Sequence, residues 1–234
     1  MVDTPGVGDA VFPIVFALFI LAAAGVAAYA YHAKLQRQRE MAALAAHHGL
    51  DFSVHDPFGT LQEPFSLLAK GDGRGVENVM WGFWHGPEVR AFDYWYYEES
   101  TDSNGRRSKS YHRFDCALVL VDARCPRLEI SNENVFTRLA DALTFRDIDF
   151  ESEEFNRRFT VKSPDRHFAT ALCDARMMAW LLRHGDGYAF ELAADRLLCW
   201  SKGVAPARIV HLLGTAKTFR EQIPDVVKSL YPNG

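Results

Sequence analysis

The sequence predicts an α+β protein, in which a single N-terminal transmembrane helix is followed by one soluble domain with an antiparallel sheet and packed helices. Three observations predict this class. Residues 11–31 contain no charged side chain, residues 78–122 are rich in strand-forming apolar and aromatic segments, and amphipathic helical segments begin at residue 163. Strands that cluster in the chain and are separated by helices are typical of α+β domains, not of alternating β-α-β units.

The first expected element is the membrane anchor, VFPIVFALFILAAAGVAAYAY, at residues 11–31. As a helix it would be about 30 Å long, which is the thickness of the hydrocarbon core of a bilayer. A signal peptide would begin with a basic region, but residues 1–10 contain no Lys or Arg. A buried core helix is rarely apolar on every side over this length. The sequence therefore predicts one membrane span, preceded by a short tail at residues 1–10.

The flanking charges predict the orientation of this span. Lys34, Arg37 and Arg39 follow it, whereas the preceding tail carries only Asp3 and Asp9. Basic residues are retained on the cytoplasmic side. We therefore expect a single-pass protein of the inner (cytoplasmic) membrane with its N-terminus outside. A juxtamembrane helix at residues 32–50 would lead into a soluble domain, residues 51–234, in the cytoplasm.

The first half of that domain is expected to be an antiparallel meander. Residues 51–64 are interpreted as a connection, and the glycines at 71, 73 and 75 as a sharp turn. Apolar and aromatic runs then predict strands at residues 78–84, 89–97 and 111–122, with a fourth at 127–130. In the third strand, Phe114, Cys116, Leu118 and Leu120 alternate onto one face.

The second half mixes helices and short strands. A short helix is expected from Ser131, with Val135, Phe136, Leu139 and Ala140 on one side. Short strands are expected at 147–150 and 159–162, and a hairpin about Ala194 and Asp195. Ser163, Pro164 and Asp165 are typical of a helix start. The helix expected from there to His184 has Leu172, Met177, Trp180 and Leu181 at helical spacing. Further helices are predicted at 205–220 and after Pro224.

Part of the sequence resembles a known group of proteins. The stretch DIDFESEEFNRRFTVKSPDRHFA, residues 147–169, together with NVMWG at 78–82 and AFDY at 91–94, resembles a family of uncharacterised bacterial proteins. These proteins carry a domain of unknown function that is anchored to the membrane. The resemblance extends over about residues 65–231 and implies a bacterial source. It implies no activity and no catalytic residue.

Composition and charge limit the possible functions. The net charge of −4 provides no basic field for nucleic acid, and the basic stretch Arg106, Arg107 and Lys109 is expected to be solvated. The four cysteines have no C-x-x-C spacing and are expected to be buried and reduced. The sequence contains neither G-x-S-x-G nor H-E-x-x-H, which are marks of two hydrolase classes.

Three other groups of residues were considered as sites. His47, His48, Asp51, His55 and Asp56 form the densest set of possible metal ligands, but the helix neighbours His47 and His48 point about 100° apart and cannot easily share one ion. The three spaced glycines are followed by a strand, whereas a phosphate-binding loop is followed by a helix. The acids Asp149, Glu151, Glu153 and Glu154 beside Arg157 and Arg158 could indicate acid–base chemistry, but Glu153–Arg157 and Glu154–Arg158 have i,i+4 spacing, and local ion pairing is the preferred interpretation. The sequence therefore assigns no catalytic, cofactor-binding or metal-binding residue.

The aromatic side chains of the first two strands allow two interpretations. Trp81, Trp84, Tyr94 and Tyr96 could belong to the core, or one sheet face could dock a partner. We expect a membrane-tethered, non-enzymatic interaction domain, an accessory subunit of a larger membrane protein complex. Its partners would be the lipid bilayer and a membrane protein. The alternative is a membrane-associated enzyme or small-ligand-binding protein whose pocket no motif reveals.

Overall fold

The computed structural model describes residues 7–132, 147–203 and 206–233. The chain divides into two compact units, Met1–Glu40 and Met41–Gly234, which are described separately. The first unit contains most of helix α1 (Val7–His47). By length and composition, the 33 residues from Val15 onward could cross a membrane, and their most apolar window is not buried within the protein. An N-terminal apolar helix is therefore present, as the sequence predicts.

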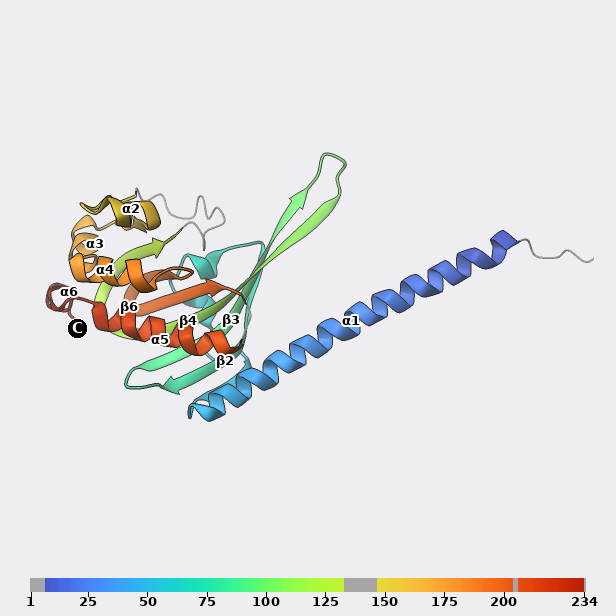
Figure 1. Cartoon of the computed structure of the whole chain (residues 1–234), viewed down its shortest axis with the longest axis horizontal. Coiled ribbons are helices and arrows are strands. Elements are labelled where there is room, and N and C mark those ends of the chain that lie inside the picture. Colours follow the sequence, from blue (N-terminus) through green and yellow to red (C-terminus); the bar gives the residue numbers. More distant parts are fainter. Residues whose placement is uncertain (1–6, 133–146, 204–205, 234) are drawn as a thin grey trace, which may run out of the picture. The chain divides into compact units, whose positions relative to one another are not determined.

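The second unit is built on one antiparallel sheet of six strands (Figure 1). In chain order they are β1 (Asp51–His55), β2 (Gly73–Phe83), β3 (Glu88–Thr101), β4 (Arg107–Ser131), β5 (Thr160–Lys162) and β6 (Ala189–Lys202). Their spatial order is β1-β2-β3-β4-β5, and β6 also pairs with β4. The predicted α+β class, an antiparallel sheet with packed helices, is confirmed.

Two strands are longer than the sequence indicates. The segments expected at 111–122 and 127–130 form the single strand β4, which passes through Pro126 where the register shifts. The hairpin expected about Ala194 and Asp195 is wrong, because β6 runs through both residues as one partner of β4. Ala194 has a φ of 52°, and the register shifts around it. A local bulge thus accommodates the turn-forming residues without reversing the chain.

Four other local expectations differ from the structure. Residues 51–64 were expected to be a connection, but they begin with the strand β1. In the segment expected as a strand at 147–150, Asp147 forms only an isolated bridge with Lys162. Ser131 is the last residue of β4, not the start of a helix. The rest of that predicted helix, with Val135, Phe136, Leu139 and Ala140, lies outside the described residues.

After the end of α1, the described part of the second unit contains five α-helices, of which the first three begin at a capping side chain. They are α2 (Glu153–Arg158), α3 (Arg166–Leu172), α4 (Ala175–His184), α5 (Pro206–Gln222) and α6 (Asp225–Leu230). The single helix expected from 163 to 184 is two helices. Asp165 caps α3 by accepting from the Phe168 N–H at 2.9 Å, and Asp174 caps α4 by accepting from the Met177 N–H at 2.8 Å. Each carboxylate binds a free N–H group of a first helical turn.

The two faces of the sheet are covered in different ways. On one face the helices, including the long α5 (Figure 1), enclose a core that contains the predicted residues Leu172, Met177, Trp180 and Leu181. On the other face the cover includes two short 3₁₀ helices, η1 (Thr60–Gln62) and η2 (Leu67–Ala69). Phe114, Cys116 and Leu118 are buried there as predicted, while Leu120 is only half-buried. All four cysteines are free and buried.

Candidate functional site

The residues considered from sequence as a metal cluster have separate structural roles. His47 is the last residue of α1, and His48 packs edge-on against Trp84 with ring centroids 6.3 Å apart. Asp56 instead accepts hydrogen bonds from the Phe58 N–H, the Thr60 N–H and the Thr60 hydroxyl. Within the described ranges, no group of three or more His, Cys, Asp and Glu could hold a metal ion.

The acidic segment around α2 is organised by contacts other than those expected. Ser152 caps the helix by accepting from the Phe155 N–H, and Glu153 and Glu154 lie in the first turn. Arg158 was expected to pair with Glu154, but its guanidinium is 2.6 Å from the Asp186 carboxylate. The ion pair therefore joins α2 to the loop after α4, which the i,i+4 spacing does not reveal.

Of the two interpretations that the sequence allows for the aromatic side chains, the structure favours the core. Trp84, Tyr94 and Tyr96 are buried, with exposed fractions of 8%, 1% and 3%, and Trp81 is partly buried. The Tyr94 hydroxyl donates to the Leu67 carbonyl at 2.9 Å, so this ring is fixed beneath η2. These side chains belong to the two cores of the domain.

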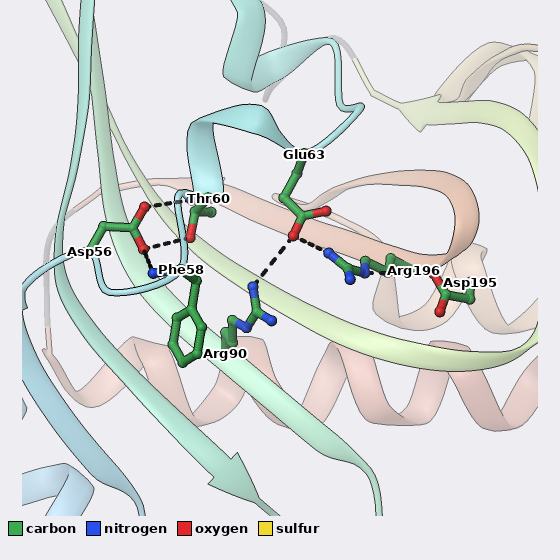
Figure 2. Close-up of polar contacts among 7 residues, drawn as sticks. All are labelled: Asp56, Phe58, Thr60, Glu63, Arg90, Asp195 and Arg196. Atoms are coloured by element: carbon green, nitrogen blue, oxygen red, sulfur yellow. Dashed lines mark hydrogen bonds and ion pairs between the residues drawn. The ribbon is translucent and has the colours of Figure 1, made fainter.

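The cover of the second sheet face is a strap, residues 56–72, which includes η1 and η2. Its apolar side chains Phe65, Leu67 and Leu68 are buried. Its polar anchor is Glu63, whose carboxylate lies between two arginines of the sheet (Figure 2). The distance to Arg90 of β3 is 3.4 Å, and Arg196 of β6 forms a second, closer ion pair.

A second anchor of the strap is a buried carboxylate. Glu191 of β6 is fully buried, and its Oε1 atom accepts from the Ser66 N–H at 2.7 Å and from the Ser66 hydroxyl at 2.6 Å. Arg127 of β4 lies 3.8 Å from the same atom and also donates to the Pro64 carbonyl. The strap is thus bound to the sheet through buried charge-assisted hydrogen bonds.

Glu191 has a second carboxylate as its neighbour. Glu129 of β4 is its direct partner in the ladder and is 6% exposed. Burial raises the pKa of the Glu129 carboxyl to about 7, and the charge of Glu191 adds to the rise. Burial raises the pKa of the Glu191 carboxyl as well, although the hydrogen bonds from Ser66 act to lower it. Burial lowers the pKa of the Lys70 ammonium to about 8, although both carboxylates act in the opposite direction.

This buried group of charged side chains is a candidate site that the sequence analysis does not identify. The usable signal was an acid inside an apolar strand run, since Glu129 lies in Leu-Glu-Ile and Glu191 in Phe-Glu-Leu. Chemically, two adjacent carboxyls beneath a strap can hold and release a proton within the physiological range.

A second feature is an aromatic platform, formed by Trp95, Tyr97 and Tyr111 on the long β3–β4 hairpin. The rings of Trp95 and Tyr97 are 6.4 Å apart between centroids and inclined by only 12°. Tyr111, which is 58% exposed, is inclined to them by 46° and 52°. The platform therefore has two nearly parallel rings and one ring inclined to both.

Two glycines of β2 lie directly beneath the two parallel rings. Gly73 is the ladder partner of Tyr97, and Gly75 is the partner of Trp95. A Cβ atom at Gly73 would lie 2.3 Å from the Tyr97 ring, and one at Gly75 would lie 2.7 Å from the Trp95 ring. The rings therefore lie directly over the bare backbone of β2. These glycines were expected in a turn, but they are strand residues that seat the aromatic rings.

The surface also has shallow hollows. One of ≈ 350 Å³ is lined by residues that include Lys202, Arg208 and His211, and another of ≈ 340 Å³ is lined by Arg124, Ala194, Asp195 and Asn233. Both are open, and neither is lined by Glu129, Glu191 or Lys70. The buried carboxyls are therefore separate from these two hollows.

Together, the fold and these sites define a class of protein, an α+β domain preceded by an apolar helix that could span a membrane. No protein-family model and no curated protein sequence matches the chain. Among solved structures, the fold is similar to the mycobacterial trehalose monomycolate transport factor A, TtfA, with a TM-score of 0.59 and 14% sequence identity. The similarity covers 80% of this chain and 96% of that protein. At this level of identity it establishes a shared fold.

Proposed function

We propose that this protein is a membrane-tethered, non-enzymatic accessory subunit of a membrane transport complex. The helix is the anchor, and the soluble domain, in the cytoplasm, is the part that contacts the transporter. The observation that carries the proposal is the combination of an apolar helix of membrane-spanning length with a domain that shares the fold of a transport factor over 96% of that factor's length.

The membrane association is supported by the character of α1. The most apolar stretch of α1 is not buried within the protein, so its side chains need another apolar environment. The basic residues Lys34, Arg37 and Arg39 then favour a cytoplasmic domain by the positive-inside bias. A permanent tether confines the search for partners to one plane, so a weak interface is sufficient for occupancy.

The accessory role is supported by the way the charged groups are used. Glu63, Glu191 and Arg127 bind the strap to the sheet, and Asp165 and Asp174 cap helices. These groups are engaged in holding the fold. A catalytic site would combine such groups with a concave pocket, and the two hollows described above do not contain the buried carboxyls.

The test is purification of the full chain in mild detergent from its own membrane, with the associated proteins identified by mass spectrometry. We expect subunits of a membrane transporter to copurify. The matched control replaces residues 11–31 with the span of an unrelated single-pass protein, which preserves tethering. Retention of the same partners would locate the contact in the soluble domain, and recovery of no membrane protein by either chain would refute the accessory role.

A second candidate is a membrane-associated enzyme or small-ligand-binding protein, and one observation favours it. The pKa values of Glu129 and Lys70 are displaced to about 7 and 8, and such displaced values are common in active sites. This candidate requires the strap to open, since it covers the carboxyls. Chemical labelling of Lys70 that is accelerated by a membrane metabolite would favour it, and unchanged labelling would count against it.

A further inference from the structure

Two arginines of the sheet share one oxygen atom of the strap. Arg90 Nη1 lies 3.4 Å from Glu63 Oε1, and Arg196 Nη1 makes a closer contact with the same oxygen (Figure 2). Within the part of the chain that the structure describes, the other carboxylate oxygen of Glu63 has no hydrogen-bond or ion-pair partner. A single carboxylate oxygen therefore holds two guanidinium groups.

Most of the hydrogen-bonding capacity of these two guanidinium groups is unused. Each has five N–H donors, of which Arg90 and Arg196 each direct one at Glu63. The Nε atom of Arg196 is buried and donates to no described residue, and the half-exposed carboxylate of Asp195 is 3.6 Å from it. A buried donor without an acceptor is unfavourable. The pair is therefore better matched to a ligand that has more acceptor oxygens than the one that Glu63 supplies.

The two guanidinium groups can be freed without lifting the whole strap. The side chains of Glu63, Arg90 and Arg196 are 11%, 14% and 28% exposed, so the group reaches the surface. The fully buried apolar side chains of the strap, of which Phe65 is the first, come after Glu63 in the chain. A rotation of the Glu63 side chain alone therefore makes both arginines available, while the apolar part of the strap stays in place.

One wall of this group is aromatic. The Arg90 guanidinium lies over the Phe58 ring, 4.0 Å from its centroid, and this cation–π contact keeps the guanidinium in position when Glu63 leaves. The Phe58 ring also packs edge-on against Trp81, with centroids 5.2 Å apart, and Trp81 is the ladder partner of Arg90. The environment of Trp81 therefore reports on the position of Arg90 and Phe58.

The chemistry of the group selects one kind of anion. A free carboxylate offers no more than Glu63 offers, and the chain holds Glu63 beside the arginines at a high effective concentration. A nucleic acid binds through many phosphate contacts spread over a basic surface, whereas here two arginines converge on one point. A terminal phosphate group carries more than one negative charge and three acceptor oxygens. Paired arginines bind such a group through parallel N–H···O contacts.

We propose that Arg90 and Arg196 form a binding site for a terminal phosphate group, and that Glu63 occupies this site until such a ligand displaces it. Inorganic phosphate, a soluble phosphomonoester and the headgroup of phosphatidic acid all carry this group. The site goes beyond the proposed function, because neither the apolar helix nor the shared fold implies it.

The test uses the full chain, labelled with fluorotryptophan, in dodecyl maltoside, a detergent without phosphate. The protein has five tryptophans, and the Trp81 resonance is assigned by its absence in Trp81→Phe. Inorganic phosphate, glycerol 3-phosphate and mixed micelles with phosphatidic acid are titrated separately at constant ionic strength, with acetate as the control anion. We expect a saturable shift of the Trp81 resonance with phosphate and none with acetate. A response to the two soluble probes identifies free phosphate as the ligand, and a response to phosphatidic acid alone identifies the lipid headgroup.

Three variants and a control locate the response. Arg90→Gln and Arg196→Gln each leave Glu63 one arginine, so the strap keeps an anchor, and each should raise the phosphate concentration at half-response about tenfold or more. Glu63→Gln removes the competing carboxylate and should lower that concentration about tenfold or more. Arg158→Gln breaks the ion pair with Asp186, away from the site, and should leave the response unchanged.

Four outcomes would overturn the site. They are a Trp81 resonance that responds to no phosphate probe, an equal response to acetate, a response that both arginine variants leave unchanged, and a response in Glu63→Gln that the wild type lacks. The last would show that the protein does not release its own carboxylate. Copurification of a transporter is measured without added phosphate, so failure of either test leaves the other proposal standing.

Discussion

The replacement Glu129→Gln should stabilise the domain at neutral and alkaline pH. Glu129 is 6% exposed, lies opposite Glu191 in the ladder, and is paired on its other side with Lys162. The cations Lys70, Lys162 and Arg127 lower its pKa, but burial and Glu191 outweigh them and raise it to about 7. The neutral acid is therefore the form that the folded protein prefers, and glutamine reproduces its shape without a charge.

The sign of the pH dependence follows from the two states. In the unfolded chain the Glu129 carboxyl has its ordinary pKa of 4.5, whereas in the folded domain it is about 7. Below pH 4.5 both states bind the proton, and the stabilisation of the neutral form is complete. As the pH rises from 4.5 to 7 this stabilisation is progressively lost, because the unfolded chain releases the proton first, and above pH 7 the folded state must hold a buried anion. At 1.36 kcal/mol per pH unit the loss is about 3 kcal/mol.

The assay is urea or thermal unfolding of the full chain in detergent from pH 5 to pH 8, followed by tryptophan fluorescence. The variant should be only slightly more stable than the wild type at pH 5 and melt roughly 6–12 °C higher at pH 8, since about 3 kcal/mol corresponds to that change in a domain of this size. Glu221→Gln, at an exposed acid, is the control and should change stability by less than about 0.5 kcal/mol. Parallel pH profiles for Glu129→Gln and wild type would refute the reasoning.

Three further predictions concern other parts of the chain. Trp180→Ala removes a ring that is 6% exposed and packs against Phe190 and Phe219, so it should lower the free energy of unfolding by about 3–5 kcal/mol; melting within a degree or two of wild type would contradict this packing. Gly73→Ala should cost about 1–3 kcal/mol in chemical denaturation, because the new Cβ meets the Tyr97 ring at 2.3 Å, and unchanged stability would show that the ring moves freely. A reporter enzyme that is active only in the periplasm, fused after Gly234, should stay inactive, and strong activity would place the domain outside.

The parts of the fold that local sequence determines were predictable. An uncharged run long enough to cross a bilayer is visible in composition, and the alternation of Phe114, Cys116 and Leu118 places them on one sheet face. The break between α3 and α4 was also accessible, since Asp174 is a strong capping residue within the apparent helix. It was obscured because the apolar spacing continues across the break, from Leu172 to Met177.

The sites were less predictable because they depend on contacts between distant segments. Glu191 is buried by the strap, and its partner there, Ser66, lies 125 residues earlier in the sequence. The role of Gly75 is defined only by the register that places Trp95 opposite it. Whether Tyr94 and Tyr96 are buried depends on what covers the second face of the sheet, and periodicity alone does not show this. Sequence patterns assign a residue to a face, whereas tertiary packing decides whether that face is exposed.

The long separation between the strap and its anchors has a consequence for biosynthesis. Glu63 is made 133 residues before Arg196, and Ser66 is made 125 residues before Glu191. At about 5–20 residues per second, the ribosome takes on the order of ten seconds to supply these anchors. During that interval the strap has no docking position, and the aromatic residues beneath it are exposed in the nascent chain. A chaperone that binds such segments would therefore act on this protein between the emergence of β3 and the completion of β6.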